Sequence, residues 1–353
     1  MFTLDDGWDI TKHIRTLGDT TGDGNLDLIG FGDPGVYVSR NRGDNSFDLP
    51  QLVHLNMGYN VPCWRVDKNP RFAVDLRNKG YVDFVGFGYE GVYVTKNNGD
   101  GTYPAGTTLV LREFGFNQGW RTDKHIRYLV DLTGNGLLDI IGFGENDVST
   151  CLGKGDGTFG KRRISFSNLS IKDGWDVKKH VRLLGDVTGN GLPDIVGFAT
   201  QGVYVCINKG DGTFELPNFL MNDFGYGRET GAWRTEKHIR TLADMNGNGR
   251  LDIVGFGNEG VWVAFSNGDG TFQPAKIMID TFGYDAGDWR VGKHPRFAVD
   301  MTGNGCADIV AFGDQAVYVT YNDGKGSLGP YETLTSEFAF RVENGTHSKQ
   351  SAM

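Results

Sequence analysis

The sequence predicts an all-β fold, a six-bladed β-propeller of four-stranded antiparallel blades. Three observations carry this prediction: one phrase recurs six times, each copy holds four strand signals, and no segment has helical periodicity over a useful length. The tryptophans that open the copies lie 55 to 58 residues apart, at Trp8, Trp64, Trp120, Trp175, Trp233 and Trp289. A period of about 40 to 60 residues with four strands per unit is typical of propeller blades. We therefore expect one propeller over residues 1–340, followed by a C-terminal tail over residues 341–353.

The first copy illustrates the four strand signals. They cover residues 14–17, 26–31, 36–38 and 47–54, and Gly-rich or Asp-Pro-Gly turns separate them. The second and third are apolar at nearly every position, as expected for strands covered on both faces. An open β-solenoid would need much shorter repeats, and the seventh phrase that begins at Arg341 has no strand signals after it. The prediction is therefore six blades rather than seven.

Composition excludes several classes of protein. The chain has 54 Gly among 353 residues without the three-residue period of collagen, which indicates many tight turns. A net charge of −9 with no long basic run gives no electrostatic footprint for nucleic acid or for insertion into an anionic membrane. The short basic cluster Lys161-Arg162-Arg163 is interpreted as a solvated edge.

Cysteine spacing and apolar content give the expected compartment. The four cysteines follow no metal or disulfide spacing, so we expect free thiols and a reducing environment. The N-terminal segment has neither a basic start nor an apolar stretch, and no run reaches the roughly 20 apolar residues of a membrane span. These features predict a protein that is cytoplasmic or released without a signal peptide.

Strand direction assigns the loops to two faces. Antiparallel strands place the turns after the first and third strands on one face, which we call the lower face. The opposite, upper face receives the Trp-Arg-x-x-Lys-His-x-Arg phrase and the turn that follows Gly-Phe-Gly. An aromatic ring beside forked hydrogen-bonding groups suits a sugar, whose C–H face packs on the ring while its hydroxyl groups bond to charged or amide groups.

The candidate carbohydrate-binding residues therefore lie on the upper face. From the phrase they are Trp120, Arg121, Lys124, His125, Arg127, Trp233, Arg234, Lys237, His238, Arg240, Trp289, Arg290, Lys293, His294, Arg296, His13 and His180. From the turn they are Asp33, Glu90, Asn146, Gln201, Glu259 and Gln315, and from the loop before the phrase Tyr59, Tyr226 and Tyr284.

An alternative interpretation of the phrase stays open, because propellers also repeat Trp and His to lock their blades.

Irregular copies of the phrase identify the pockets that are expected to be weakened. Asn69 replaces the His in repeat 2, and Asp9 and Asp176 replace the Arg that follows Trp in repeats 1 and 4.

The lower-face loops raise the question of a metal. Asp19, Thr21, Asp23 and Asp27 space their oxygen atoms as a calcium loop does. Most other copies have only two carboxylates, and such Asp side chains also bond the amides of their own turn. Calcium is thus a candidate for at least one of the lower-face loops, with the first repeat the best candidate, and no cofactor is required.

The combination of Lys-His-x-Arg, Asp-x-x-Gly-[Asp/Asn]-Gly-x-x-Asp, Gly-Phe-Gly and Gly-Val-Tyr-Val resembles the fungal propeller lectins typified by Psathyrella velutina lectin. It is similar to the N-acetylglucosamine-specific lectin of Agrocybe aegerita. The resemblance covers about residues 2–340. It implies binding of terminal N-acetylglucosamine in pockets between adjacent blades, with glycans and glycoproteins as partners and no catalysis.

Two other functions compete with a multivalent lectin. An integrin-like protein-binding scaffold would need one large asymmetric patch. A propeller glycosidase would need two carboxylates about 5–10 Å apart in one central site, and no copy gains a unique acid pair on the upper face.

Overall fold

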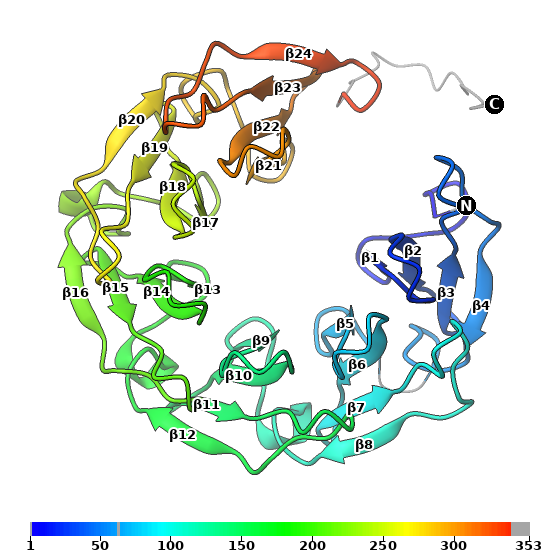
Figure 1. The fold of residues 1–353 in the computed structure, drawn as a ribbon. Coiled ribbons are helices and arrows are strands. Elements are labelled where there is room, and N and C mark those ends of the chain that lie inside the picture. Colours follow the sequence, from blue (N-terminus) through cyan, green and yellow to red (C-terminus); the bar gives the residue numbers. More distant parts are fainter. Residues whose placement is uncertain (1, 62–63, 340–353) are drawn as a thin grey trace. The chain divides into compact units, whose positions relative to one another are not determined.

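The computed structural model of the protein describes residues 2–61 and 64–339. In this part of the chain, strands β1 to β24 form six four-stranded sheets, and each sheet keeps its strands in chain order (Figure 1). Neighbouring strands pair antiparallel in every sheet. The fold is a six-bladed β-propeller, which confirms the predicted fold class. The expected tail, residues 341–353, lies outside the described residues.

The described chain divides into two compact units. The first holds blades 1–3 and runs up to residue 177, together with residues 208–214. Its strands are β1 (Ile14–Gly18), β2 (Asp27–Phe31), β3 (Val36–Ser39) and β4 (Gln51–His54) in blade 1; β5 (Arg71–Val74), β6 (Asp83–Phe87), β7 (Val92–Thr95) and β8 (Thr108–Leu111) in blade 2; and β9 (Ile126–Val130), β10 (Asp139–Phe143), β11 (Val148–Cys151) and β12 (Arg163–Phe166) in blade 3.

The second unit holds blades 4–6, in residues 178–207 and the chain from residue 215 on. Its strands are β13 (Val181–Gly185), β14 (Asp194–Phe198), β15 (Val203–Cys206) and β16 (Asn218–Met221) in blade 4; β17 (Ile239–Ala243), β18 (Asp252–Phe256), β19 (Val261–Ala264) and β20 (Lys276–Ile279) in blade 5; and β21 (Arg296–Val299), β22 (Asp308–Phe312), β23 (Val317–Thr320) and β24 (Glu332–Thr335) in blade 6.

Helical structure in the described residues is limited to short 3-10 turns, η1 (Phe116–Gln118), η2 (Ile171–Asp173) and η3 (Arg228–Thr230). None of them could cross a membrane.

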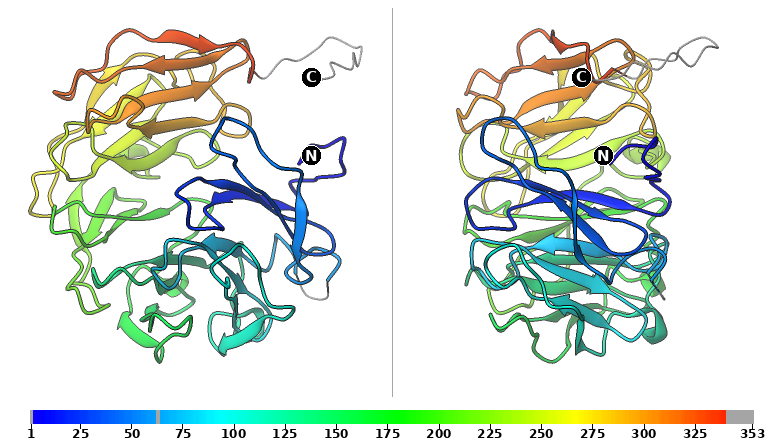
Figure 2. Two further views of the ribbon diagram at one scale, coloured as in Figure 1. Left: turned by 45° about the vertical axis from the view of Figure 1, so that its right-hand side comes forward. Right: turned by 90° about the vertical axis from the view of Figure 1, so that its right-hand side faces the viewer.

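The strands of blade 1 lie close to their predicted positions. In this blade, drawn in blue, β1 to β4 follow one another across the sheet (Figure 2). The fourth strand is shorter than expected, because it starts at Gln51 rather than Phe47. Phe47 instead forms an isolated bridge with Asn41 across the turn. The prediction thus extended the strand into the turn that precedes it.

The second strand of each blade carries the core. All five residues of β6 are buried, as are all five of β10. Val85 and Phe87 of blade 2 pack in one cluster with Ile140 and Cys151 of blade 3. The apolar character at every position therefore reflects strands with neighbours on both faces.

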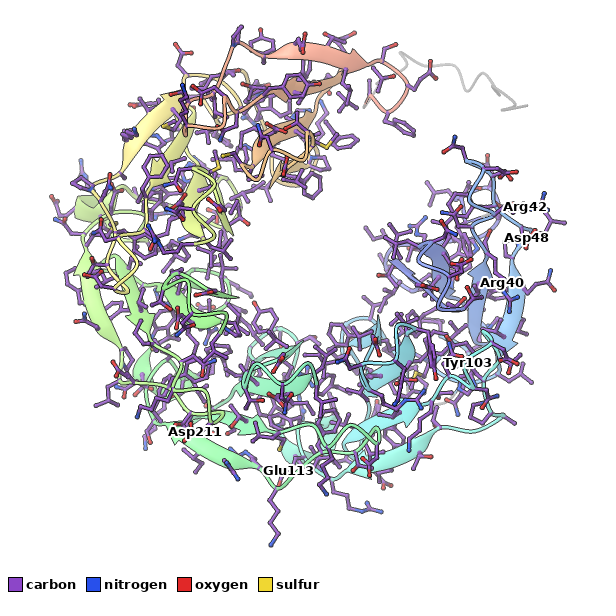
Figure 3. All side chains as sticks on the ribbon, viewed as in Figure 1. Arg40, Arg42, Asp48, Tyr103, Glu113 and Asp211 are labelled. Atoms are coloured by element: carbon purple, nitrogen blue, oxygen red, sulfur yellow. The ribbon has the colours of Figure 1, made fainter. Side chains whose placement is uncertain are left out.

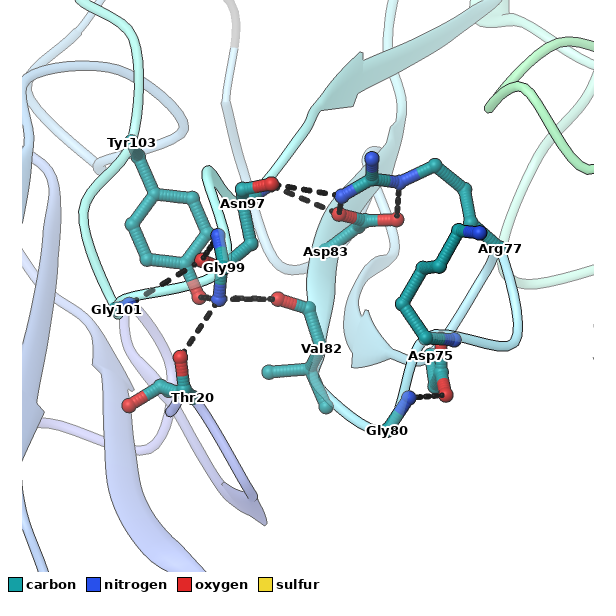
Figure 4. A network of polar contacts seen from close by, with 11 residues as sticks. Thr20, Asp75, Arg77, Gly80, Val82, Asp83, Asn97, Gly99, Gly101 and Tyr103 are labelled. Carbon is teal, nitrogen blue, oxygen red and sulfur yellow. Dashed lines mark hydrogen bonds and ion pairs between the residues drawn. The ribbon is translucent and has the colours of Figure 1, made fainter. Parts of the chain in front are cut away.

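Polar side chains also join neighbouring blades within a unit. Asn97 Nδ2 donates to the carbonyl of Thr20 in blade 1 at 2.8 Å and to that of Val82 in its own blade at 3.1 Å (Figure 4). Arg40 of blade 1 donates from Nη2 to the Asp100 carbonyl of blade 2 at 3.0 Å, near the labelled Tyr103 (Figure 3). These bonds lie at lower-face turns, so the lower loops help to hold the blades together.

The thiols of Cys151, Cys206 and Cys306 are free and buried. Cys63 lies outside the described residues. Burial raises the pKa of the Cys151 thiol to about 12, which keeps it protonated and unreactive.

Candidate functional site

Three upper-face pockets in blades 1, 5 and 6 have corresponding linings. Each is lined by the Trp that opens the phrase, the His five residues later, the residues of the turn between the second and third strands, and an aromatic residue of the third strand. The members in this order are Trp8, His13, Asp33 and Tyr37 in blade 1; Trp233, His238, Asn258 and Trp262 in blade 5; and Trp289, His294, Asp314 and Tyr318 in blade 6. The cavity volumes are about 500, 280 and 230 Å³.

The histidine in each pocket is a bridge rather than a free group. His238 Nδ1 accepts the backbone N–H of Arg234 at 3.1 Å, and the other ring nitrogen, Nε2, donates to Asn258 Oδ1 at 2.8 Å. The same pair of bonds links His294 to Arg290 and Asp314, at 3.2 Å each. Because Nδ1 of His238 accepts a backbone N–H, the His238 ring is neutral with its proton on Nε2. The histidine therefore fixes the turn residue at the mouth of the pocket.

Burial reinforces this neutral state. The side chain of His238 is largely buried, and burial is the main cause that lowers its pKa below the usual value. Burial lowers the pKa of His125 in the same way, even though Glu145 accepts a hydrogen bond from it at 3.3 Å. Desolvation disfavours the charged imidazolium in both blades.

The turn residues that the histidines contact are the ones sequence reasoning missed. They are Glu145, Thr200, Asn258 and Asp314, each 20 residues after its histidine, as Asp33 is. The predicted Asn146, Gln201, Glu259 and Gln315 lie one residue further on. Alignment of the copies on Gly-Phe-Gly, rather than on the most polar turn residue, would have found them. Glu259 and Gln315 still line the pockets of blades 5 and 6, whereas Glu90 pairs with Arg112 at 2.7 Å.

The last arginine of the phrase points to the backbone. Arg240 is buried, and its Nη1 donates to the carbonyl of Phe224 at 3.1 Å; Arg296 reaches the carbonyl of Phe282 in the same way at 2.8 Å. Burial lowers the pKa of each arginine to about 10, which leaves it charged at neutral pH. Arg127 makes the corresponding bond to the carbonyl of Phe114 at 2.9 Å.

The accepting carbonyls belong to strained residues. Phe224 and Phe282 are fully or almost fully buried and have φ of 54° and 63°, in the left-handed region. This conformation costs about 1 kcal/mol or more for a residue with a side chain. The links before the phrases of blades 5 and 6 are thus held in one shape by the buried Phe and by the arginine. The predicted sugar contact of Arg127, Arg240 and Arg296 stays a prediction.

The arginine after the Trp stacks on the aromatic residue of the preceding loop. The guanidinium of Arg234 lies 3.9 Å from the centre of the Tyr226 ring, and that of Arg290 lies 3.8 Å from the Tyr284 ring. Lys237, from the preceding blade, lies 4.5 Å from the same Tyr284 ring. Tyr59 is placed likewise between Lys12 and Arg65, and Arg121 stacks on Phe116 at 3.5 Å. These aromatic rings therefore pack between cationic side chains of neighbouring blades within a unit.

The remaining predicted residues lie around these pockets. Trp120 and His125 keep the same arrangement in blade 3, with ring centres 5.3 Å apart, and Lys124 is exposed beside them. Lys293 forms an ion pair with Asp314 at 2.5 Å. His180 contacts the Thr200 hydroxyl at 2.9 Å.

The irregular copies differ in what they lose. In repeat 2, Asn69 Oδ1 accepts the N–H of Arg65 at 3.1 Å, so it replaces the first bond of the histidine. Its Nδ2 donates to the carbonyl of Phe87 at 3.2 Å instead of to the turn. In repeat 1, Asp9 bonds Thr11 and the pocket is nevertheless formed.

The lower loop proposed for calcium uses its carboxylates internally. Asp19 Oδ1 accepts the N–H groups of Thr21 and Gly22 at 2.9 and 2.7 Å, and Oδ2 accepts that of Gly24 at 2.7 Å. Burial acts to raise the pKa of Asp19, but these amides hold it below its usual value. Asp27 Oδ2 accepts the N–H of Thr20 at 3.0 Å and Oδ1 that of Asn41 at 2.8 Å.

Asp23 is also occupied, because it accepts the N–H of Asn25. Among the described residues, no group of three or more His, Cys, Asp or Glu is placed to hold a metal. The carboxylates of the loop thus make Asx-type turns, and the calcium site at Asp19, Thr21, Asp23 and Asp27 stays a prediction.

Comparison with known proteins identifies relatives by structure. No protein family model matches the chain, and no curated protein matches it in sequence. A lectin of Agrocybe aegerita, solved to explain its specific recognition of non-reducing terminal N-acetylglucosamine, is 48% identical to the chain. It matches 96% of this chain and 84% of its own, with a TM-score of 0.93.

The Photorhabdus luminescens Tc holotoxin pore matches more distantly, at 17% identity and a TM-score of 0.55. The match covers 90% of this chain but only 14% of the toxin chain, and it shows a shared fold alone. The Agrocybe aegerita match, at 48% identity over nearly the whole chain, identifies the family: this chain belongs to the family of β-propeller lectins that includes the Agrocybe aegerita lectin.

Proposed function

We propose that this protein is a multivalent lectin that binds terminal N-acetylglucosamine on glycans and glycoproteins, in upper-face pockets formed by each phrase and the link from the preceding blade. The observation that carries the proposal is the recurrence of one pocket design in blades 1, 5 and 6, in a chain 48% identical to a lectin for this sugar.

The chemistry of the blade 5 pocket supports a sugar ligand. Trp262 supplies an aromatic wall, on which the C–H face of a pyranose packs. Asn258 and Glu259 offer amide and carboxylate groups from the turn before β19, suited to hydroxyl groups and to an acetamido N–H. Asp223, whose pKa is raised by burial, adds a polar group from the link.

Several weak pockets on one molecule suit the recognition of surfaces. A glycan-coated surface engages them together, and avidity then exceeds the affinity of one pocket by about 10² to 10⁴. Agglutination of particles that display N-acetylglucosamine is the expected activity.

Catalysis is not part of the proposal, because the pocket design recurs in blades 1, 5 and 6 and the relative that is 48% identical is a lectin. The blade 5 pocket does hold two acidic residues, Asp223 and Glu259, which the sequence prediction of no unique acid pair missed, whereas Thr281 and Gln315 occupy the corresponding places in blade 6. A glycosidase needs its two carboxylates about 5–10 Å apart. Release of a chromophore from a nitrophenyl N-acetylglucosaminide at a useful rate would contradict this part of the proposal.

Isothermal titration calorimetry with N-acetylglucosamine tests the proposal. We expect clearly more than one site per chain, and much weaker binding of glucose, which lacks the acetamido group. A single site, or no binding of either sugar, would contradict the repeated-pocket model.

A further inference from the structure

Blade 3 departs from the pocket design at three positions that face one another. The third-strand aromatic residue, which is Tyr37 in blade 1 and Trp262 in blade 5, is Ser149 in blade 3. Register fixes this equivalence, because Ser149 pairs with Ile164 as Trp262 pairs with Ile277. The aromatic wall of the pocket is therefore missing in blade 3.

The second departure lies on the fourth strand. The residue just before the paired segment is Pro50 in blade 1 and Tyr331 in blade 6, and both line their pockets. The corresponding residue is Ala275 in blade 5 and Arg162 in blade 3. Blade 3 thus brings a guanidinium to a pocket-lining position.

The third departure lies in the turn. Gly35 and Gly260 occupy a position where a Cβ would approach a carbonyl oxygen to about 2 Å, at 1.9 Å from that of His54 and 2.1 Å from that of Ile279. Blade 6 has Ala316 at this position, and blade 3 has Asp147, so only in blade 3 does the position carry a carboxylate among these four blades.

The three residues form one network. Arg162 Nη2 lies 2.7 Å from Asp147 Oδ1, and Arg162 Nε donates to Ser149 Oγ at 3.0 Å. The Ser149 hydroxyl in turn donates to Asp147 Oδ1, and Ser149 is fully buried. Arg162 is exposed, as the sequence predicted for Lys161-Arg162-Arg163, but its guanidinium is held by Asp147 and Ser149. The three residues that differ from the other blades are hydrogen-bonded to one another, which indicates that they changed together and altered one site.

The rest of the blade 3 phrase is unchanged. Trp120 is buried beside His125, and His125 bridges the N–H of Arg121 at 3.0 Å and Glu145 at 3.3 Å. The other members of the pocket design are therefore present, and only the wall that would receive the apolar face of a sugar is replaced.

We infer that Asp147, Ser149 and Arg162 close the blade 3 pocket to the sugar that blades 1, 5 and 6 take, and that they thereby set the number of sugar sites per chain. The pockets of blades 1, 5 and 6 offer an aromatic ring to the C–H groups of a pyranose, whereas blade 3 has in its place a serine that is hydrogen-bonded to a guanidinium held by a carboxylate. This inference rests on the proposed lectin function.

A conversion back to the design of the other blades tests it. In the triple variant Asp147→Gly, Ser149→Tyr, Arg162→Ala, each new residue is the one found at that position in blade 1 or blade 5. We expect calorimetry with N-acetylglucosamine to count one more site per chain than in the unmodified protein. An unchanged count in a variant with an unchanged circular dichroism spectrum would overturn the inference.

A reciprocal variant keeps the inference testable if the triple variant does not fold. Trp262→Ser with Ala275→Arg transfers two blade 3 residues to blade 5, and we expect the loss of one site. Retention of that site in a folded double variant would overturn the inference. If the unmodified protein binds no N-acetylglucosamine, the proposed function itself fails, which is a different result from equal counts in all variants.

Arg163→Ala is the matched control. Arg163 belongs to the same basic cluster, but its exposed side chain reaches the Asp211 carbonyl at 3.4 Å and not the Asp147 network. The site count should stay at the unmodified value, so a gain caused merely by removal of a positive charge is detected by this variant.

Discussion

The upper phrase and the lower Asp/Gly loops of blade 5 repeat equally often along the chain, yet they differ in where their polar groups point. In the lower loop, Asp252 is fully buried and accepts the N–H groups of Met245 and Ser266 at 2.9 and 2.8 Å. In the upper phrase, both ring nitrogens of His238 form hydrogen bonds within the protein, and one of these bonds holds Asn258 at a cavity. Repetition alone therefore does not separate a binding motif from a folding motif.

The difference lies in satisfaction of the polar groups. A buried carboxylate whose oxygen atoms accept the amides of its own loop presents no polar group to a ligand. A phrase that holds a turn residue beside an open cavity still has hydrogen-bonding capacity to offer. Substitutions that affect stability and sugar binding separately can test this difference between the two loops.

The largest effect is expected from loss of a lower-loop carboxylate. Asp252→Ala leaves two buried backbone N–H groups without acceptors, and each costs about 1 to 3 kcal/mol. Urea denaturation should show a loss of about 2 to 6 kcal/mol in the free energy of unfolding. The number of sugar sites counted by calorimetry should not change. If the variant lost a site without losing stability, the lower loop would belong to the binding machinery.

The next effect is expected from His238. His238→Ala leaves the Arg234 N–H without its acceptor, so we expect a loss of about 1 to 2 kcal/mol in stability together with one weakened sugar site. His238→Asn provides the comparison, because Asn69 makes the corresponding backbone bond in blade 2. The Asn variant should be more stable than the Ala variant but equally deficient in binding, as judged by thermal denaturation and calorimetry. Full sugar binding by the Asn variant would show that contact with Asn258 is not needed.

A pH dependence of stability follows from the same histidines. The pKa values of His125 and His238 are lowered in the folded protein, while the unfolded chain keeps a value near 6.5. Below pH 6.5 the unfolded state therefore binds more protons, and the free energy of unfolding should fall as the pH is lowered. Melting temperatures between pH 7.5 and 5 should decline less steeply in His238→Asn than in the unmodified protein. Parallel curves would mean that His238 does not contribute to the acid sensitivity.

The sequence allowed prediction of the blades because their signals are local. Strand β2 is an apolar run between turn residues, and Trp spacing counts the copies whatever their contacts. The Trp and His of the pockets could be named for the same reason, since they lie at fixed places in a repeated phrase. Burial of Arg240 against the Phe224 carbonyl could not be foreseen, because it depends on the left-handed conformation of a buried Phe.

The replacement of the aromatic wall in blade 3 could not be predicted from the sequence, for a related reason. Asp147, Ser149 and Arg162 lie on three segments, and their meaning appears only when strand register places them together. Arg162 by itself resembles any charged residue at a strand edge. Contacts between segments, rather than the residues of one motif, therefore decide which copies of the phrase keep an aromatic wall.

The smallest effect is expected from removal of divalent cations. This experiment tests directly whether the lower-face Asp/Gly loops bind a ligand. Because Asp19 already accepts three backbone N–H groups and Asp27 accepts two more, a calcium ion would have to displace bonds that the loop makes without it. Excess EDTA should therefore leave the melting temperature unchanged within about one degree, since a cation at concentration c stabilises the fold by RT ln(1 + c/Kd), which is negligible when c lies well below Kd. Added calcium after dialysis should be equally without effect. A fall of several degrees with EDTA that calcium alone restores would show that the first loop rearranges around a cation, and the lower loops would then have to be counted as ligand sites as well.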